Sequence, residues 1–136
     1  MNVLYTGITS LFTGATGHAY YTAIGGRQYL KKAPQGATFP YCVYFMVSDF
    51  ADRSFTEQEE EFLIQFNIFS RNNSASEAGT ILAALFTRYD YCTLTVAGYN
   101  FISMQRDFVV PNDDFSQDTP IYGYSVQYTT IIQKAR

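Results

Sequence analysis

The C-terminal segment 121–132 alternates strictly between two kinds of side chain, which restricts the chain to a sheet with two different faces. A second segment, 57–69, alternates in the same way after an acidic opening. One face of these strands carries Phe62, Ile64, Phe66, Ile68, Tyr122, Tyr124, Val126, Tyr128, Thr130 and Ile132; the other carries Leu63, Gln65, Asn67, Phe69, Gly123, Ser125, Gln127 and Thr129. We therefore expect one face on a core and the other wet or at an interface.

Further strands are predicted at 27–30, 41–48, 92–96 and 99–108. Segment 41–48 is apolar at successive positions, which is typical of a central strand covered on both faces. Residues 49–56 are predicted to turn the chain, and residues 111–120 to form a polar loop. Ala97-Gly98 predicts a hairpin turn between the strands at 92–96 and 99–108.

The spacing of apolar residues predicts a helix over 74–89. Ser74 and Glu77 have capping-box spacing, in which each side chain satisfies a backbone N–H near the other. The apolar stripe of this helix consists of Ala78, Ile81, Leu82, Leu85, Phe86 and Tyr89. Such a helix must pack on the sheet.

The order of elements predicts one α+β domain over residues 1–136, mainly an antiparallel sheet packed against two helices. Residues 1–12 permit a short helix, and glycines at 14, 17, 25 and 26 then interrupt the chain. We therefore interpret residues 1–26 as an N-terminal helix or arm that precedes the rest of the domain, residues 27–136.

Composition points to association more than to catalysis. Charged residues make up 15% of the 136 positions, whereas the chain holds 12 Tyr and 12 Phe. A tyrosine-rich, charge-poor surface is typical of protein–protein contacts, although a sheet also favours aromatic residues. A net charge of −3 argues against binding nucleic acid through its phosphates. No apolar run is long enough to span a membrane, and no secretory signal is expected.

The residues that usually carry chemistry are sparse. His18 is the only histidine, and we interpret it as a surface or helix-end residue. Cys42 and Cys92 lie in apolar runs and are expected to be free buried thiols. Neither a Walker motif nor a nucleophile elbow is present. We therefore expect no enzyme activity, no metal and no cofactor.

Two acidic groups are the remaining polar clusters. The first consists of Glu57, Glu59, Glu60 and Glu61, and the second of Asp113, Asp114 and Asp118. Neither has the ligand spacing or turn glycine of a calcium loop. A solvated strand end and a solvated loop explain them, and a functional acidic surface is the alternative.

The segment 33–40 reads Ala-Pro-Gln-Gly-Ala-Thr-Phe-Pro and runs into an apolar strand. An Arg-x-Tyr strand precedes it, and a Phe69-Ser70-Arg71 step, a helix with a Ser/Glu start and an acidic loop before a final aromatic strand follow. In this order the chain resembles the tail-completion or tail-terminator proteins of tailed bacteriophages. The resemblance covers residues 27 to 136.

The resemblance implies a virion protein of the phage neck, assembled in the host bacterial cytoplasm. Family members form a ring, usually a hexamer, that ends tail-tube polymerisation and joins the tail tube protein to a head-side connector or stopper. DNA passes through the lumen without specific binding. No catalytic residue is carried over. The alternatives are another neck or tail component, such as a head–tail stopper or the tube protein, and a small-ligand-binding α+β domain.

Two sets of residues are candidates for this assembly role. The rigid loop between two prolines is a candidate contact between subunits, through Pro34, Gln35, Gly36, Phe39 and Pro40. The acidic groups are candidates for the lumen, through Glu57, Glu59, Glu61, Asp113 and Asp114. Like charge would keep DNA from adhering to such a channel.

Overall fold

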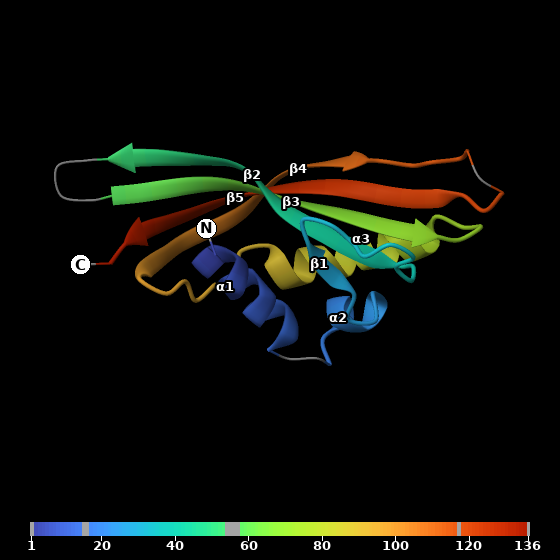
Figure 1. Cartoon of the computed structure of the whole chain (residues 1–136), viewed down its shortest axis with the longest axis horizontal. Helices are drawn as coiled ribbons and strands as arrows, with labels where there is room; N and C mark the ends of the chain where they lie inside the picture. The colour runs from blue at the N-terminus through green and yellow to red at the C-terminus, as the bar shows by residue number, and fades with distance from the viewer. Residues whose placement is uncertain (1, 15–16, 54–57, 117, 136) are drawn as a thin grey trace.

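The computed structural model describes residues 2–14, 17–53, 58–116 and 118–135, with the backbone alone described at 50–53 and 58. Figure 1 shows a long twisted sheet with the helices on one side of it. In chain order the elements are α1 (Asn2–Thr13), α2 (Ala19–Ala23), β1 (Gln28–Leu30), β2 (Tyr41–Arg53), β3 (Gln58–Arg71), α3 (Ser76–Tyr89), β4 (Tyr99–Pro111) and β5 (Ile121–Lys134).

The five strands lie in the order β1-β2-β3-β5-β4. Strand β1 runs parallel to β2, and the other three pairs are antiparallel. The expected α+β class is therefore confirmed, with two substantial helices, α1 and α3, and the short α2. Register shifts occur at Val47 in β2 and at Ile102 and Asp107 in β4, so these two strands carry β-bulges.

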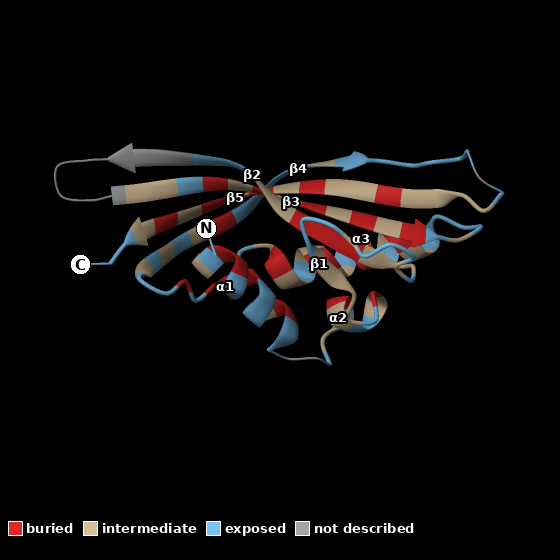
Figure 2. Ribbon diagram, viewed as in Figure 1, coloured by how far each residue is buried: buried red, intermediate tan, exposed pale blue. Residues whose placement is uncertain are grey.

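The alternation of β3 and β5 produces the expected two faces (Figure 2). Phe62, Ile64, Phe66 and Ile68 are fully buried under the helices, whereas the residues between them are half-buried on the opposite side. We call that opposite side the open face. No helix lies over that side of the sheet in Figure 1.

Strand β2 differs from the prediction in two respects. It extends to Arg53, so the turn predicted over 49–56 is wrong as far as residue 53, and residues 54–57 lie outside the described residues. It is also not covered on both faces. Cys42 and Tyr44 enter the core, while Tyr41 and Phe45 are half-buried on the open face, where aromatic neighbours account for the apolar sequence.

Helix α3 begins at Ser76, and the predicted capping box is wrong. Ala75 is the N-cap residue and makes no side-chain cap. The Ser74 hydroxyl accepts from the Ser76 N–H at 3.2 Å, and Glu77 instead accepts from the buried hydroxyl of Ser70 at 2.5 Å. A buried hydroxyl needs a partner, and Glu77 supplies it from the first turn of the helix.

Residues 92–96 form no strand, so the predicted hairpin at Ala97-Gly98 is also wrong, although a turn is present there. Leu94 and Val96 are buried in the core. The segment passes so close to α1 that a Cβ at Gly7 would lie 2.7 Å from the Thr95 carbonyl oxygen. The segment therefore packs against a helix and forms no ladder with β4.

The core is rich in tyrosine. Tyr20, Tyr44, Tyr89 and Tyr128 are each at most 2% exposed. Their hydroxyls find partners inside the protein: Gln28 bonds Tyr20 at 2.7 Å and Tyr89 at 3.2 Å, Thr9 bonds Tyr44 at 2.7 Å, and Asp90 accepts from Tyr128 at 2.6 Å. Burial raises the pKa of all four phenols, so they stay protonated donors.

The tyrosines are divided between the core and the surface. Six further tyrosines are half-buried, and Tyr91 is the only described tyrosine among the exposed large hydrophobic residues. The others are Leu30, Val47, Ile102, Phe108, Val110 and Phe115. The apolar surface of the subunit is therefore concentrated in a few positions, mostly on or beside the outer strands.

Candidate assembly surfaces

The open face carries a row of hydrogen-bonded amides across β3 and β5. The Gln127 side-chain amide donates to Gln65 at 3.0 Å, and Gln65 donates to Asn67 at 2.8 Å. Beside them, Thr129 donates to Asp107 on β4 at 2.6 Å. These groups satisfy one another, so the middle of the open face is polar and mostly uncharged. The sequence signal for this row was the polar residues at alternate positions of the two strands.

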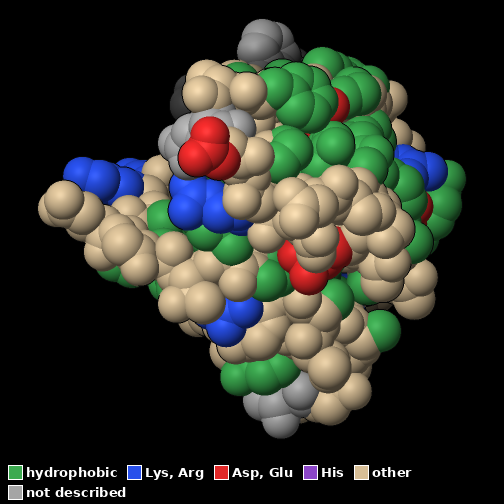
Figure 3. Space-filling model, turned by 90° about the vertical axis from the view of Figure 1, so that its right-hand side faces the viewer, with side chains coloured by type: hydrophobic (Ala, Val, Ile, Leu, Met, Phe, Trp, Pro, Cys, Tyr) green, Lys and Arg blue, Asp and Glu red, His purple; other side chains and the backbone are tan. Residues whose placement is uncertain are grey.

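Aromatic side chains lie at one end of the open face. Tyr41 contacts the rings of Tyr29, Phe39 and Phe69, with centroids 5.0–6.0 Å apart. The Arg71 guanidinium lies 4.7 Å from the Phe39 ring centroid, in cation–π geometry. Figure 3 views this end of the molecule and shows hydrophobic side chains gathered in its upper part, at the level of the sheet.

The proline-bracketed loop divides into a fixed base and an exposed tip. At the base, Arg27 donates to the carbonyl oxygens of Pro40 at 2.9 Å and of Phe39 at 3.4 Å, and the Phe39–Pro40 peptide bond is cis. At the tip, Pro34, Gln35 and Gly36 are exposed. The Ala37 N–H bonds the Pro34 carbonyl at 3.1 Å, and Gly36 has the positive φ of 76° that a type II turn needs.

We expect removal of residues 35–38 to weaken association between subunits more than it lowers the melting temperature. The tip is exposed, and a rigid turn loses little entropy when it binds. A matched variant replaces 35–38 with Gly-Ser-Gly-Ser, which keeps the length but removes the side chains. Mass measurement of the assembled species tests both. Normal assembly by both variants would exclude the tip as a contact.

The two candidate acidic groups lie at opposite ends of the sheet. Glu59 and Glu61 occupy open-face positions of β3, next to Gln133 and Ile131 of β5. The other group lies beside Gly123, whose β3 partner is Phe69. Ten residues of β3 separate Glu59 from Phe69, or about 34 Å at 3.4 Å per residue. The structure therefore does not bring the two groups together, and Glu57 lies outside the described residues.

Asp113 and Asp114 help to form the loop between β4 and β5. Asp113 accepts from the Gly123 N–H at 3.2 Å, and Asp114 accepts from the Ser116 N–H at 2.9 Å. Hydrogen bonds from the Ser116 side chain and backbone lower the pKa of Asp114. The Asp114 backbone also pairs with Ile121 through two hydrogen bonds. Both carboxylates are thus engaged in local structure, while Glu61 is exposed on an open strand face.

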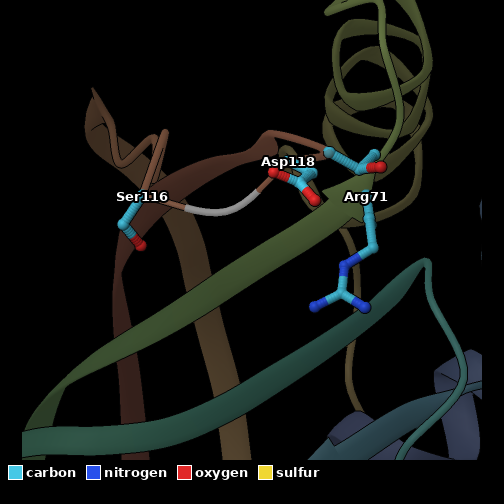
Figure 4. A pocket seen from close by; sticks show the side chains of 4 residues that line it. Arg71, Ser116 and Asp118 are labelled. Atoms are coloured by element: carbon cyan, nitrogen blue, oxygen red, sulfur yellow. The ribbon is translucent and has the colours of Figure 1, made fainter.

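An open polar hollow lies beside this loop, lined by Arg71, Ser116, Asp118 and Thr119. Figure 4 shows that the labelled side chains do not converge, because Arg71 extends away from Ser116 and Asp118. Its guanidinium lies over the Phe39 ring instead. A ligand site needs polar groups aimed at one volume. Arg71 thus packs on Phe39 at the base of the loop. Its position in the sequence did not indicate this contact.

His18 and the two cysteines are structural. The Nε2–H of His18 donates to the Phe12 carbonyl at 2.8 Å, so its Nδ1 is free to accept from the Tyr21 N–H at 3.1 Å and cap α2. This confirms the helix-end interpretation. Both thiols are free, as expected, but only Cys42 is buried and Cys92 is half-buried. Burial raises the pKa of Cys42 to about 12 and of Cys92 to about 11. Neither is a thiolate nucleophile at neutral pH.

Within the described parts of the chain, no three His, Cys, Asp or Glu side chains are grouped so as to hold a metal ion. No helix among the described residues is long and apolar enough to cross a bilayer.

Comparison with known proteins identifies a solved structure with the same fold. No protein-family model and no curated protein matches this sequence. A chain in a solved structure, described as the virion of a native gene transfer agent (GTA) particle, superposes with a TM-score of 0.66. The match covers 90% of this chain and 91% of that chain, at 8% sequence identity. The two chains share a fold over nearly their whole length.

Proposed function

We propose that this chain is a non-enzymatic structural protein of a phage-like virion, which forms a ring on the end of the tail tube. The ring stops tube polymerisation, joins the tail to the head and lets DNA pass. The main support is the shared fold with a chain of a virion particle, over nearly the full length of both chains. The loop and strand motifs that resemble tail-terminator proteins support the narrower role.

The surface of the subunit agrees with this proposal. A ring requires two different contact surfaces on each subunit, because each copy binds its neighbours head to tail. The exposed apolar residues lie mostly at the two edges of the sheet: Leu30 and Val47 on one side, and Ile102, Phe108 and Val110 on the other. The open face, with amides and carboxylates, suits a channel wall that DNA slides past.

The proposal is tested by imaging tails assembled with and without this protein. We expect tubes of uncontrolled length, or full-length tails that fail to join heads, when it is absent. Complete absence of tubes would instead identify a tube subunit, and tubes of normal length that lose only head joining would favour a stopper. Normal tails joined to heads without the protein would contradict every one of these virion roles.

A further inference from the structure

Tyr91 is the most exposed large hydrophobic residue described, at 81% of its surface. It follows α3 directly and has a φ of 54°, a left-handed conformation that costs free energy for any residue with a Cβ. Its N–H donates to the Met104 carbonyl at 3.2 Å, on the outer side of β4. The backbone thus holds an aromatic ring in solvent at one edge of the sheet, in a conformation that glycine would adopt more easily.

A groove lies at the opposite edge, on the same side of the sheet. It is an open hollow of 320 Å³ between α1 and the end of β1. Its lining is part apolar and part hydroxyl or amide, formed by Asn2, Tyr5, Thr6, Thr9, Ser10 and Leu30. The Lys31 ammonium lies beside it, 5.9 Å from the centroid of the Tyr5 ring. This lining suits a ring with an apolar body and a polar tip, as tyrosine has.

Tyr91 and the groove between α1 and β1 lie at similar positions along the direction of the strands. The Tyr5 hydroxyl, in the groove, accepts from the Met46 N–H. The register leads from Met46 through Ile64 and Tyr128 to Arg106, which is two residues along β4 from Met104. The offset along the strands is about 7 Å, against about 14 Å for the three strand spacings between β2, which carries Met46, and β4. Subunits of a planar ring meet at equal height, so this offset is small enough for contact.

The edges are also built for side-chain contact and not for strand pairing. At one edge the Met46 N–H already donates to the Tyr5 hydroxyl, and at the other the Met104 carbonyl already accepts from the Tyr91 N–H. Bulges at Val47 and Ile102 interrupt the regular ladder beside both positions. Such devices prevent one sheet from simply continuing into the next.

We infer that Tyr91 of one subunit inserts into the α1–β1 groove of a second copy of this chain, and that this contact closes the ring. The inference rests on the proposed function, since the ring supplies the need for two different edges. Beside Tyr91, the Asp90 carboxylate is already paired with Arg106 at 3.6 Å, so the contact rests on the exposed ring and the mixed apolar and polar lining of the groove, and not on charge.

The test uses Tyr91→Gly, which removes the ring and suits the positive φ. We expect a melting temperature equal to or above that of the wild type, with association weakened at least 30-fold, the loss that corresponds to a binding hot spot of about 2 kcal/mol. Tyr91→Phe keeps the aromatic body and is expected to assemble. Ser10→Trp, at an exposed position in the groove, is expected to block assembly in the same way as Tyr91→Gly. Mass measurement across a concentration series gives the association.

Phe115→Ala is the control, because Phe115 is 64% exposed but lies on the β4–β5 loop. An equal loss in this control would overturn the assignment, because the effect would then follow exposed aromatic area. Normal rings from Tyr91→Gly or Ser10→Trp would also overturn it, while leaving the ring itself in place. A different result would contradict the proposed function itself, namely that tails assembled without this protein still join heads.

Discussion

Replacement of Phe66 with alanine is expected to lower the free energy of unfolding by about 3–5 kcal/mol. Phe66 is fully buried in the middle of β3, where its ring contacts Tyr44, Tyr89 and Tyr128 with centroids 4.7–5.7 Å apart. The truncation removes a large apolar side chain and leaves a cavity among rings whose hydroxyls are tied to fixed partners. Those partners limit how far the neighbouring rings can collapse into the space.

Phe45→Ala is the matched control. Phe45 lies one register position away, on the open face of β2, and is half-buried. The same atoms are removed, but part of the ring already faces water, so the loss should be clearly smaller. Urea unfolding of both variants measures the difference, with an unchanged slope showing that midpoints can be compared. Equal midpoints for the two variants would contradict the assignment of the core to the helix side.

The two-faced sheet was predictable because side-chain alternation is a local property. Each apolar residue of β3 and β5 that was assigned to one face is on that face, because successive side chains of a strand point to opposite faces and the face of one residue fixes the face of the next. The apolar stripe of α3 was predictable for the same reason. Its pattern recurs at every third or fourth residue, and no distant partner is needed to set it.

Two of the errors have a different cause, which is contact with residues outside the local pattern. Residues 92–96 have the composition of a strand, but the close approach of Thr95 to Gly7 places them against α1. Glu77 has the spacing of a capping box, but Ser70, seven residues earlier, takes its carboxylate. Neither competing partner can be recognised from the local pattern.

The candidate surfaces were predictable only in part. The loop tip and the exposed Glu61 followed from composition, because charge and proline-bracketed turns favour the surface. Tyr91 was not predictable, because its importance lies in a positive φ and an exposed ring, and neither can be read from a run of aromatic residues. The distribution of tyrosine between core and surface depends on which hydroxyls find partners, which is again a long-range property.

Replacement of both Glu59 and Glu61 with lysine is expected to make DNA adhere inside the ring. Both residues occupy the open face of β3, which we propose to line the channel. The double substitution changes the net charge of the chain from −3 to +1, because each replacement adds two positive charges to −3. A ring repeats this change in every subunit. New lysines that contact phosphates release counterions, so retention of DNA becomes steeply dependent on salt.

The readout is DNA release and infectivity at several salt concentrations. With six or more phosphate contacts in the ring, DNA retention should fall about 10³–10⁵-fold between 50 and 200 mM salt. The double substitution to glutamine is the matched control, because it removes the two carboxylates without adding a cation, and it should leave DNA passage close to normal. The Asp118→Lys variant adds positive charge in the β4–β5 loop, at the far end of the sheet. Equal retention of DNA by that variant, or unaltered passage in the lysine double mutant, would place the glutamates outside the channel.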